Sequence, residues 1–265
     1  MRLRFLGTGT SFGVPVVGCN CPVCQSGDRR NRRSRHGLAL EKDGRVLLVD
    51  TPTELRLQLL EAGIDHVDAV FITHPHADHV HGIDDLRVFS LRGKRAVPML
   101  VAREHADEFR ARFAYIFDDS VEPDPATATP EIDLRTFEAG DDLEIAGFRV
   151  RALAFPHGRV RSFGFRSGGL GVIVDAKEIP DVALAVLKGV DVLVINALWW
   201  GDPHPSHFNV EEALAAAGRV GAKRTYLTHL THRLDYSELL AGLPDNVLPA
   251  FDGLVVEIDP ARVVR

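Results

Sequence analysis

Three histidines and an aspartate crowd into six consecutive positions, and this cluster constrains the chain more than any other feature of its sequence. The segment 74–79 reads HPHADH and follows an apolar stretch, 67–73, that is predicted to form a strand. His74 and His76 lie two positions apart, so an extended backbone points both imidazoles to one side. Asp78 and His79 follow after the chain turns and can serve a second ion. A polar surface loop would account for one histidine but not for this spacing, and these ligand types suit zinc, manganese or iron.

The rest of the chain predicts an α/β fold in one domain, residues 1–265. Hydrophobic residues make up 45% of the sequence and charged residues 26%, which allows a large buried core. No linker or repeat divides the chain. Helices alternate with strands in both halves, so we expect helices outside two central sheets, with loops gathered at one edge. The predicted strands are 2–6, 38–40, 46–49, 67–73, 148–155, 170–174, 190–195 and 225–227; the predicted helices are 53–62, 103–113, 180–187 with proline in its first turn, and 209–218 with a capping box.

The charge balance and the apolar segments restrict the partners. Lys and Arg number 31 and Asp and Glu number 37, a net charge of −6, so broad nucleic-acid binding is not expected. A small anionic substrate stays compatible, because bound metal ions dominate their local field. The sequence has neither a signal peptide nor an apolar run of roughly 18 residues, so we predict a cytoplasmic protein without a membrane partner.

The cysteines form a second cluster. Cys19, Cys21 and Cys24 are the only cysteines of the chain. An odd, closely spaced set without an export signal favours metal binding over disulfides, with three free thiols as the alternative. A closed zinc site needs a fourth ligand from elsewhere in the chain.

The HPHADH segment resembles the H-x-H-x-D-H signature of the metallo-β-lactamase superfamily. The resemblance spans nearly the whole chain and implies a four-layer αββα sandwich with two divalent metal ions, zinc or manganese, at one edge. It implies that one ion is held by His74, His76 and His157 and the other by Asp78, His79 and His229, with Asp175 bridging them and Asp50 supporting the ligands. Taken singly, His157 could be an ordinary loop histidine and Asp175 a helix cap.

Two adjacent cations lower the pKa of a shared water, so a metal-bridging hydroxide is available near neutral pH, and they stabilise negative charge in the transition state. We therefore expect a hydrolase.

The cysteine cluster indicates which members of the superfamily this chain resembles most. Within the superfamily it resembles the cyclic phosphodiesterases of the bacterial phosphonate (carbon–phosphorus lyase) pathway, in which a histidine three positions after the last active-site histidine completes the cluster. Here that residue is His232, which implies a structural zinc; His36 is the competing ligand. This resemblance favours a small phosphodiester substrate, specifically a cyclic ribose phosphate, and is in keeping with a homodimer. A relative linked to pyrroloquinoline quinone biosynthesis carries a similar cluster, but the complete HPHADH segment here favours hydrolysis over a non-catalytic role.

Phosphodiester cleavage needs a general acid for the leaving oxygen. His207 matches a histidine used near the scissile phosphate by phosphodiesterases of the superfamily, and it can be charged near neutral pH. We place His207 and Asp78 among the catalytic residues, with His204 as the alternative acid. Transfer-RNA 3′ processing and hydrolysis of other esters or thioesters remain alternatives. The segment 103–130 is either a lid or a surface excursion, and the arginines within 29–35 either contact phosphate or form a solvated face or a dimer contact.

Overall fold

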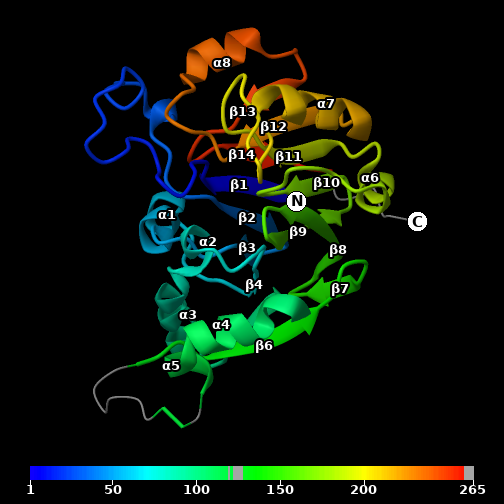
Figure 1. Cartoon of the computed structure of the whole chain (residues 1–265). Helices are drawn as coiled ribbons and strands as arrows, with labels where there is room; N and C mark the ends of the chain where they lie inside the picture. Colours follow the sequence, from blue (N-terminus) through cyan, green and yellow to red (C-terminus); the bar gives the residue numbers. More distant parts are fainter. Residues whose placement is uncertain (119, 122–127, 260–265) are drawn as a thin grey trace.

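Two mixed seven-stranded sheets form the centre of the molecule, with helices on both outer faces (Figure 1). The computed structural model describes residues 1–118, 120–121 and 128–259. The strand order of the first sheet is β14-β1-β2-β3-β4-β5-β6, and that of the second is β13-β12-β11-β10-β9-β8-β7. Both sheets change from antiparallel to parallel pairing part of the way across, at β3 and at β10. The predicted four-layer αββα sandwich is confirmed.

The bounds of the elements are as follows. The first sheet comprises β1 (Arg2–Gly7), β2 (Gly37–Lys42), β3 (Arg45–Val49), β4 (Ala69–Phe71), β5 (Val97–Ala102), β6 (Ile132–Phe137) and β14 (Val255–Glu257). The second comprises β7 (Asp142–Ile145), β8 (Phe148–His157), β9 (Val160–Ser167), β10 (Leu170–Ile173), β11 (Val192–Asn196), β12 (Arg224–Thr228) and β13 (Val247–Pro249). The helices are α1 (Leu55–Ala62), α2 (Ala77–Val80), α3 (Arg87–Gly93), α4 (Ala106–Arg112), α5 (Ala114–Phe117), α6 (Asp181–Leu187), α7 (Val210–Val220) and α8 (Tyr236–Gly242), with 3₁₀ turns η1 (Arg29–Asn31), η2 (Ile83–Leu86) and η3 (Arg103–His105).

Three apolar cores hold these four layers together. Between the sheets, the Phe71 ring lies 5.0 Å from Phe137 and 5.1 Å from Phe165, centroid to centroid. Residues of α1 and α4 pack on the outer face of the first sheet, and α6 and α7 pack on that of the second. The buried face of α7 is built largely of alanine, which brings the helix close to its sheet. None of the described helices has the length and apolar character needed to cross a membrane.

Several predicted boundaries shift for local reasons. The strand predicted at 67–73 spans only Ala69–Phe71, because the Thr73 backbone N–H donates to the Asp50 carboxylate, 2.8 Å away, instead of to a strand. The helix predicted at 103–113 divides into η3 and α4, and Phe113 leaves helical geometry. Pro180 is the N-cap of α6 and does not lie within its first turn. Residues 122–127 of the predicted loop lie outside the described residues, so the lid stays a prediction.

Two helix signals are confirmed. Asn209 and Glu212 form a capping box in which each side chain accepts a hydrogen bond from the other's backbone N–H. Gly63 ends α1 in the left-handed region, at φ 67°, where its N–H reaches the carbonyls of Leu59 and Leu60.

The half-buried carboxylate of Asp252 joins three distant parts of the chain beside the end of β1. Asp252 accepts hydrogen bonds from the backbone N–H and the hydroxyl of Thr8, at 2.9 and 2.7 Å, and of Ser34, at 2.6 and 2.7 Å. The carbonyl of Thr8 in turn accepts from the N–H of Leu230, 2.8 Å away. Asp252 therefore fixes the loops that follow β1 and precede β2, and through Thr8 the segment that follows β12.

We expect Asp252→Asn to lower the free energy of unfolding by about 1–3 kcal/mol. One carboxylate oxygen would become an amide NH₂ group, which cannot accept a hydrogen bond from the backbone N–H and the hydroxyl that now donate to that oxygen. Urea denaturation followed by circular dichroism measures the change, with the exposed Asp245→Asn as the matched control. Equal stability of the two variants would contradict this account.

Candidate metal centres

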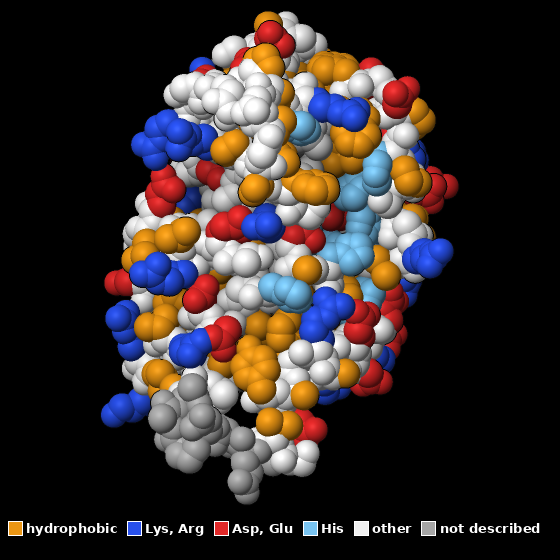
Figure 2. All heavy atoms as spheres, turned by 60° about the vertical axis from the view of Figure 1, so that its left-hand side comes forward, with side chains coloured by type: hydrophobic (Ala, Val, Ile, Leu, Met, Phe, Trp, Pro, Cys, Tyr) orange, Lys and Arg blue, Asp and Glu red, His pale blue; other side chains and the backbone are white. Residues whose placement is uncertain are grey.

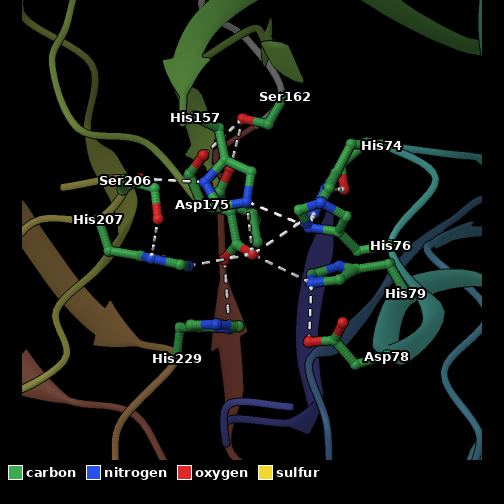
Figure 3. A network of polar contacts seen from close by, with 12 residues as sticks. His74, His76, Asp78, His79, His157, Ser162, Asp175, Ser206, His207 and His229 are labelled. Carbon is green, nitrogen blue, oxygen red and sulfur yellow. Dashed lines mark hydrogen bonds and ion pairs between the residues drawn. The ribbon is translucent and has the colours of Figure 1, made fainter. Parts of the chain in front are cut away.

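The candidate ligands lie where strands end, all at one edge of the two sheets. Residues His74, His76, Asp78 and His79 follow β4 and run into α2; His157 closes β8; Asp175 follows β10; and His229 follows β12. Figure 3 shows that these side chains converge on the carboxylate of Asp175. Histidine side chains also reach the surface along one strip of the molecule (Figure 2). The two sheets therefore contribute to a single site, as the resemblance implied.

Three histidines form the tightest group. The Nδ1 atom of His76 lies 2.9 Å from Nε2 of His74 and 3.2 Å from Nε2 of His157. One ring nitrogen of each of the three lies within 4.8 Å of the others. His74 and His157 are buried, whereas His76 is exposed. A single ion could be held by this group and still be open to a substrate from the side of His76.

Asp175 stands between the histidines of the two sheets. Its Oδ2 atom lies 3.2 Å from Nε2 of His79, 3.4 Å from Nε2 of His207 and 3.6 Å from Nε2 of His74, and its Oδ1 lies 3.2 Å from Nδ1 of His229. Burial opposes the charge of this carboxylate, but His229, His79 and His207 hold its pKa well below the usual value. Asp175 is therefore a negative centre placed to touch two ions at once.

The second predicted ligand set, Asp78, His79 and His229, is not one of the described groups whose ligand atoms all lie within 4.8 Å of one another. Such groups instead join His79 with His74 and Asp175, and His207 with His157 and Asp175. Asp78 Oδ2 lies 3.4 Å from Nε2 of His79, and His229 is joined to them through Asp175. Burial lowers the pKa of His229 to about 3. The pKa of His79 would also fall on burial, but Asp78, Asp175 and Asp50 hold it well above its usual value. A cation placed between these groups would take over the charge that the proton on His79 otherwise supplies.

Orphaned polar atoms show that the residues present fit divalent cations. Nε2 of His79, Nε2 of His207, Nδ1 of His229 and Oδ1 of Asp175 are buried without a hydrogen-bond partner among the described residues. Buried polar groups are normally paired, and those left unpaired point to a ligand or ion. Nitrogen and carboxylate oxygen donors are those that zinc and manganese accept.

A layer of residues behind the ligands fixes their orientation. Asp50 Oδ2 lies 2.7 Å from Nδ1 of His79 and also accepts from the Thr73 hydroxyl, 2.9 Å away. The Ser206 carbonyl lies 3.0 Å from Nδ1 of His157. The Ser162 hydroxyl lies 2.7 Å from the carbonyl of Val174 and 2.8 Å from that of Asp175. Asp50 supports the ligands as expected, but no sequence signal singled out Thr73, Ser162 or Ser206, because isolated hydroxyl residues are common at strand ends.

Backbone strain is concentrated in the same place. Asp50, Asp175 and His229 have φ angles of 66°, 54° and 58°, in the left-handed region that residues other than glycine rarely adopt. Each such residue costs about 1–3 kcal/mol unless its surroundings impose the conformation. Asp50 and His229 immediately follow a strand and Asp175 comes two residues after one, so each turn aims its side chain into the site and not along the sheet.

His207 is the histidine nearer to the candidate metal ligands. Its Nε2 faces Asp175, while its Nδ1 lies 3.0 Å from the Ser206 hydroxyl and 3.2 Å from Nδ1 of His204. His204 stands behind it, edge-on to the Trp199 ring at 5.6 Å. His207 therefore faces Asp175, and His204 lies on the other side of the His207 ring.

The cysteine cluster forms a separate group at the edge of this site. Nδ1 of His232 lies 3.3 Å from Sγ of Cys19, 3.5 Å from that of Cys21 and 3.7 Å from that of Cys24. A hydrogen bond from the Cys24 N–H lowers the pKa of the Cys21 thiol to about 6, which favours the thiolate that binds metal. Three sulfurs and one imidazole match the ligand number and type of a structural zinc.

His36 does not belong to this cluster. It is fully buried beside the active site, with its ring 5.9 Å from that of His79 and 6.5 Å from that of His229. Burial lowers its pKa to about 3, so it lies there as the neutral imidazole. The alternative of His36 as fourth ligand was wrong. His36 lies beside His79 and His229, and the histidine grouped with the three cysteines is His232.

The arginines of segment 29–35 make hydrogen bonds and ion pairs within the chain. Arg33 is buried and donates to the carbonyls of Thr231, at 2.7 Å, and Leu234, at 2.8 Å. Arg29, Arg30 and Arg35 form ion pairs with Glu61, Asp28 and Glu54. Arg33 therefore clamps the segment that carries both His229 and His232.

A family model described as the beta-lactamase superfamily domain matches residues 45–230, and the chain belongs to this superfamily. The crystal structure of a diphosphatase from the PhnP family superposes with a TM-score of 0.88 and 33% identity, over 97% of this chain and 98% of that one. The chain is 28% identical over 298 residues to a ribonuclease Z of Bradyrhizobium sp. (strain ORS 278), covering 91% of this chain and 93% of that protein.

It is also 37% identical over 261 residues to an octanoyltransferase of Porphyromonas gingivalis, but it spans only 52% of that protein, about half of its length. Superfamily and donor set together define a metal-dependent hydrolase of the β-lactamase fold.

We expect Asp50→Ala to weaken metal binding in the active site by about 10- to 100-fold, because His79 loses the acceptor that orients it. Competition with a chromophoric chelator measures the affinity. Asp65→Ala, which removes an exposed carboxylate beside His66, is the control. An unchanged affinity in Asp50→Ala would show that Asp50 has no part in positioning the ligands.

We expect His232→Ala to lower the bound zinc by one ion per chain and to leave the active-site ions in place, because only one of the two ligand groups loses a member. Metal content is measured by mass spectrometry of the desalted protein, with His66→Ala alongside. The same zinc content in both variants would argue against the cysteine site.

Proposed function

We propose that this chain is a phosphoric diester hydrolase that acts on small substrates with two divalent ions, zinc or manganese. The observation that carries the proposal is His207, whose Nε2 faces Asp175 at 3.4 Å and which we assign to the substrate, although its geometry with His157 and Asp175 would also allow it to hold an ion. A histidine in that place can donate a proton to a leaving oxygen. Support comes from the likeness to a diphosphatase and to a ribonuclease Z, since both names denote attack at phosphorus.

The proposed ligands follow the groups described above. His74, His76 and His157 would hold one ion, Asp78, His79 and His229 the other, and Asp175 would contact both. When bound, two divalent ions supply a water of lowered pKa and offset the negative charge that develops on the phosphoryl oxygens.

His207 would hold the proton that the leaving oxygen receives. Its Nε2 points toward the ligand cluster, and its Nδ1 is held by the Ser206 hydroxyl and His204. These two contacts limit rotation of the ring, so the nitrogen that faces the site stays directed at the substrate. Because Ser206 also holds His157 through its carbonyl, the acid and one metal ligand are positioned by the same residue.

The substrate we propose first is a cyclic ribose phosphodiester. A diphosphate linkage is the second candidate, favoured by the 33% identity to the diphosphatase. A net charge of −6 argues against broad contact with an RNA backbone.

The leaving group tests the role of His207. We expect His207→Ala to lower kcat/KM by about 100- to 10,000-fold on ribose 1,2-cyclic phosphate, whose leaving alkoxide needs a proton. We expect a much smaller loss on bis(p-nitrophenyl) phosphate, whose leaving group is a weak base. His204→Ala tests the alternative acid, and Asp78→Ala should lose activity on both substrates.

Equal losses of His207→Ala on the two substrates would remove the acid role and leave the metal site. If the metal-loaded wild type hydrolyses neither diester, the proposal of a phosphodiesterase fails, and esters and thioesters become the next substrates to assay.

A further inference from the structure

A polar hollow of about 530 Å³ lies next to the candidate active site. One wall is the turn that joins β8 to β9 and includes Pro156, Gly158 and Arg159. The other wall comes from η3 and α4 and includes Glu104 and Glu108. The hollow belongs to neither of the two ligand groups.

The turn that forms this wall is fixed to the active site. Pro156 and Gly158 flank His157 in the sequence, and His157 pairs with Val160 across the hairpin, so only Gly158 and Arg159 form the loop. Gly158 has a φ of 60° and sits against Ser206, where an added Cβ would lie 3.3 Å from the Ser206 Cβ. Figure 3 shows His157 and Ser206 on the same side of Asp175 as His207. Arg159 is therefore held two residues from a metal ligand.

The opposite wall is tied to the same edge. Arg112, at the end of α4, donates a hydrogen bond to the carbonyl of Pro75, which lies between His74 and His76. The hollow thus adjoins the histidine group proposed to hold the first ion, since Pro156 and Gly158, which line it, flank His157. A substrate bound to that group can extend into it.

Among the described charged side chains that line the hollow, one guanidinium has no carboxylate partner. Glu104 pairs with Arg161, with 3.1 Å between Oε1 and Nε, and Glu108 pairs with Arg112. Arg159 is exposed and makes no hydrogen bond or ion pair with the rest of the described chain. A guanidinium without a carboxylate partner, beside a site for phosphoryl groups, is suited to a second phosphate, which it can bind through two parallel hydrogen bonds.

We propose that Arg159 is a specificity-determining residue that binds the second phosphoryl group of a diphosphate diester whose first phosphoryl group lies at the histidine group. This inference rests on the proposed function and extends it to a substrate class. A diester with a single phosphoryl group gains nothing from Arg159, whereas a diphosphate places its extra negative charge next to the group attacked. The contact forms on binding, so it acts mainly on KM.

The test compares two substrates that differ in the second phosphoryl group: the p-nitrophenyl ester of thymidine 5′-monophosphate, with one, and ADP-ribose, with two. In the metal-loaded protein, we expect Arg159→Ala to raise KM for ADP-ribose about 10- to 100-fold and to change KM for the nitrophenyl ester less than about 3-fold. Arg159→Lys should recover part of the loss, because it restores the charge without the fork. Arg149→Ala, an exposed arginine at the far end of β8, is the matched control.

Raised salt should increase KM for ADP-ribose in the wild type, because it screens the charge of Arg159. The KM of Arg159→Ala should change little. Equal changes on both substrates, or no change, would overturn the proposal. If the wild type hydrolyses neither of these two substrates, the proposed function is still judged by the two diesters named for it above. Calorimetric binding of ADP-ribose then decides on Arg159: weaker binding to Arg159→Ala than to Arg149→Ala supports its role, and equal binding overturns it.

Discussion

The carboxylate of Asp175 is the contact on which the site depends. It is 2% exposed, and its two oxygens face histidines from both sheets. A buried charge is costly unless it is paired. Here the carboxylate is surrounded by imidazoles, whose ring nitrogens can also coordinate a metal ion. The position of Asp175 at the seam of the two sheets places one negative group between the two candidate ligand sets.

The seam exists because strands of both sheets end at one edge. β3 and β4 in the first sheet run parallel to each other, as do β10, β11 and β12 in the second, so residues just past their ends meet. The left-handed conformations of Asp50, Asp175 and His229 store strain there. The Thr73 hydroxyl bonds to the Asp50 carboxylate, and the Ser162 hydroxyl bonds to the Asp175 carbonyl. The surrounding sandwich thus keeps these residues in their strained conformations.

The amino-terminal segment links the two candidate metal sites. His229 and His232 lie in one short stretch after β12, and this stretch is held from three directions: by the sulfurs through His232, by Arg33 through two carbonyls, and by Thr8 through the Leu230 N–H. The cysteine cluster thus does more than close a loop. It fixes the segment that carries the last active-site histidine, while burial lowers the pKa of Arg33 to about 10 without removing its charge near neutral pH.

The sequence by itself determined the ligand types, their order and the strands that precede them, because the HPHADH segment, the capping box and the cysteine spacing are local patterns with local causes. It predicted the sandwich through the resemblance but not the short strands β13 and β14, whose pairing partners β12 and β1 lie elsewhere in the chain. Only the tertiary structure showed that His232, and not His36, joins the cysteines, and that His207, and not His204, faces Asp175, since the members of each pair differ in their place in the fold and not in chemistry. The contacts of Thr73, Ser162 and Arg33 were decided in the same way, because the groups that a hydroxyl or a guanidinium meets come from other segments of the chain.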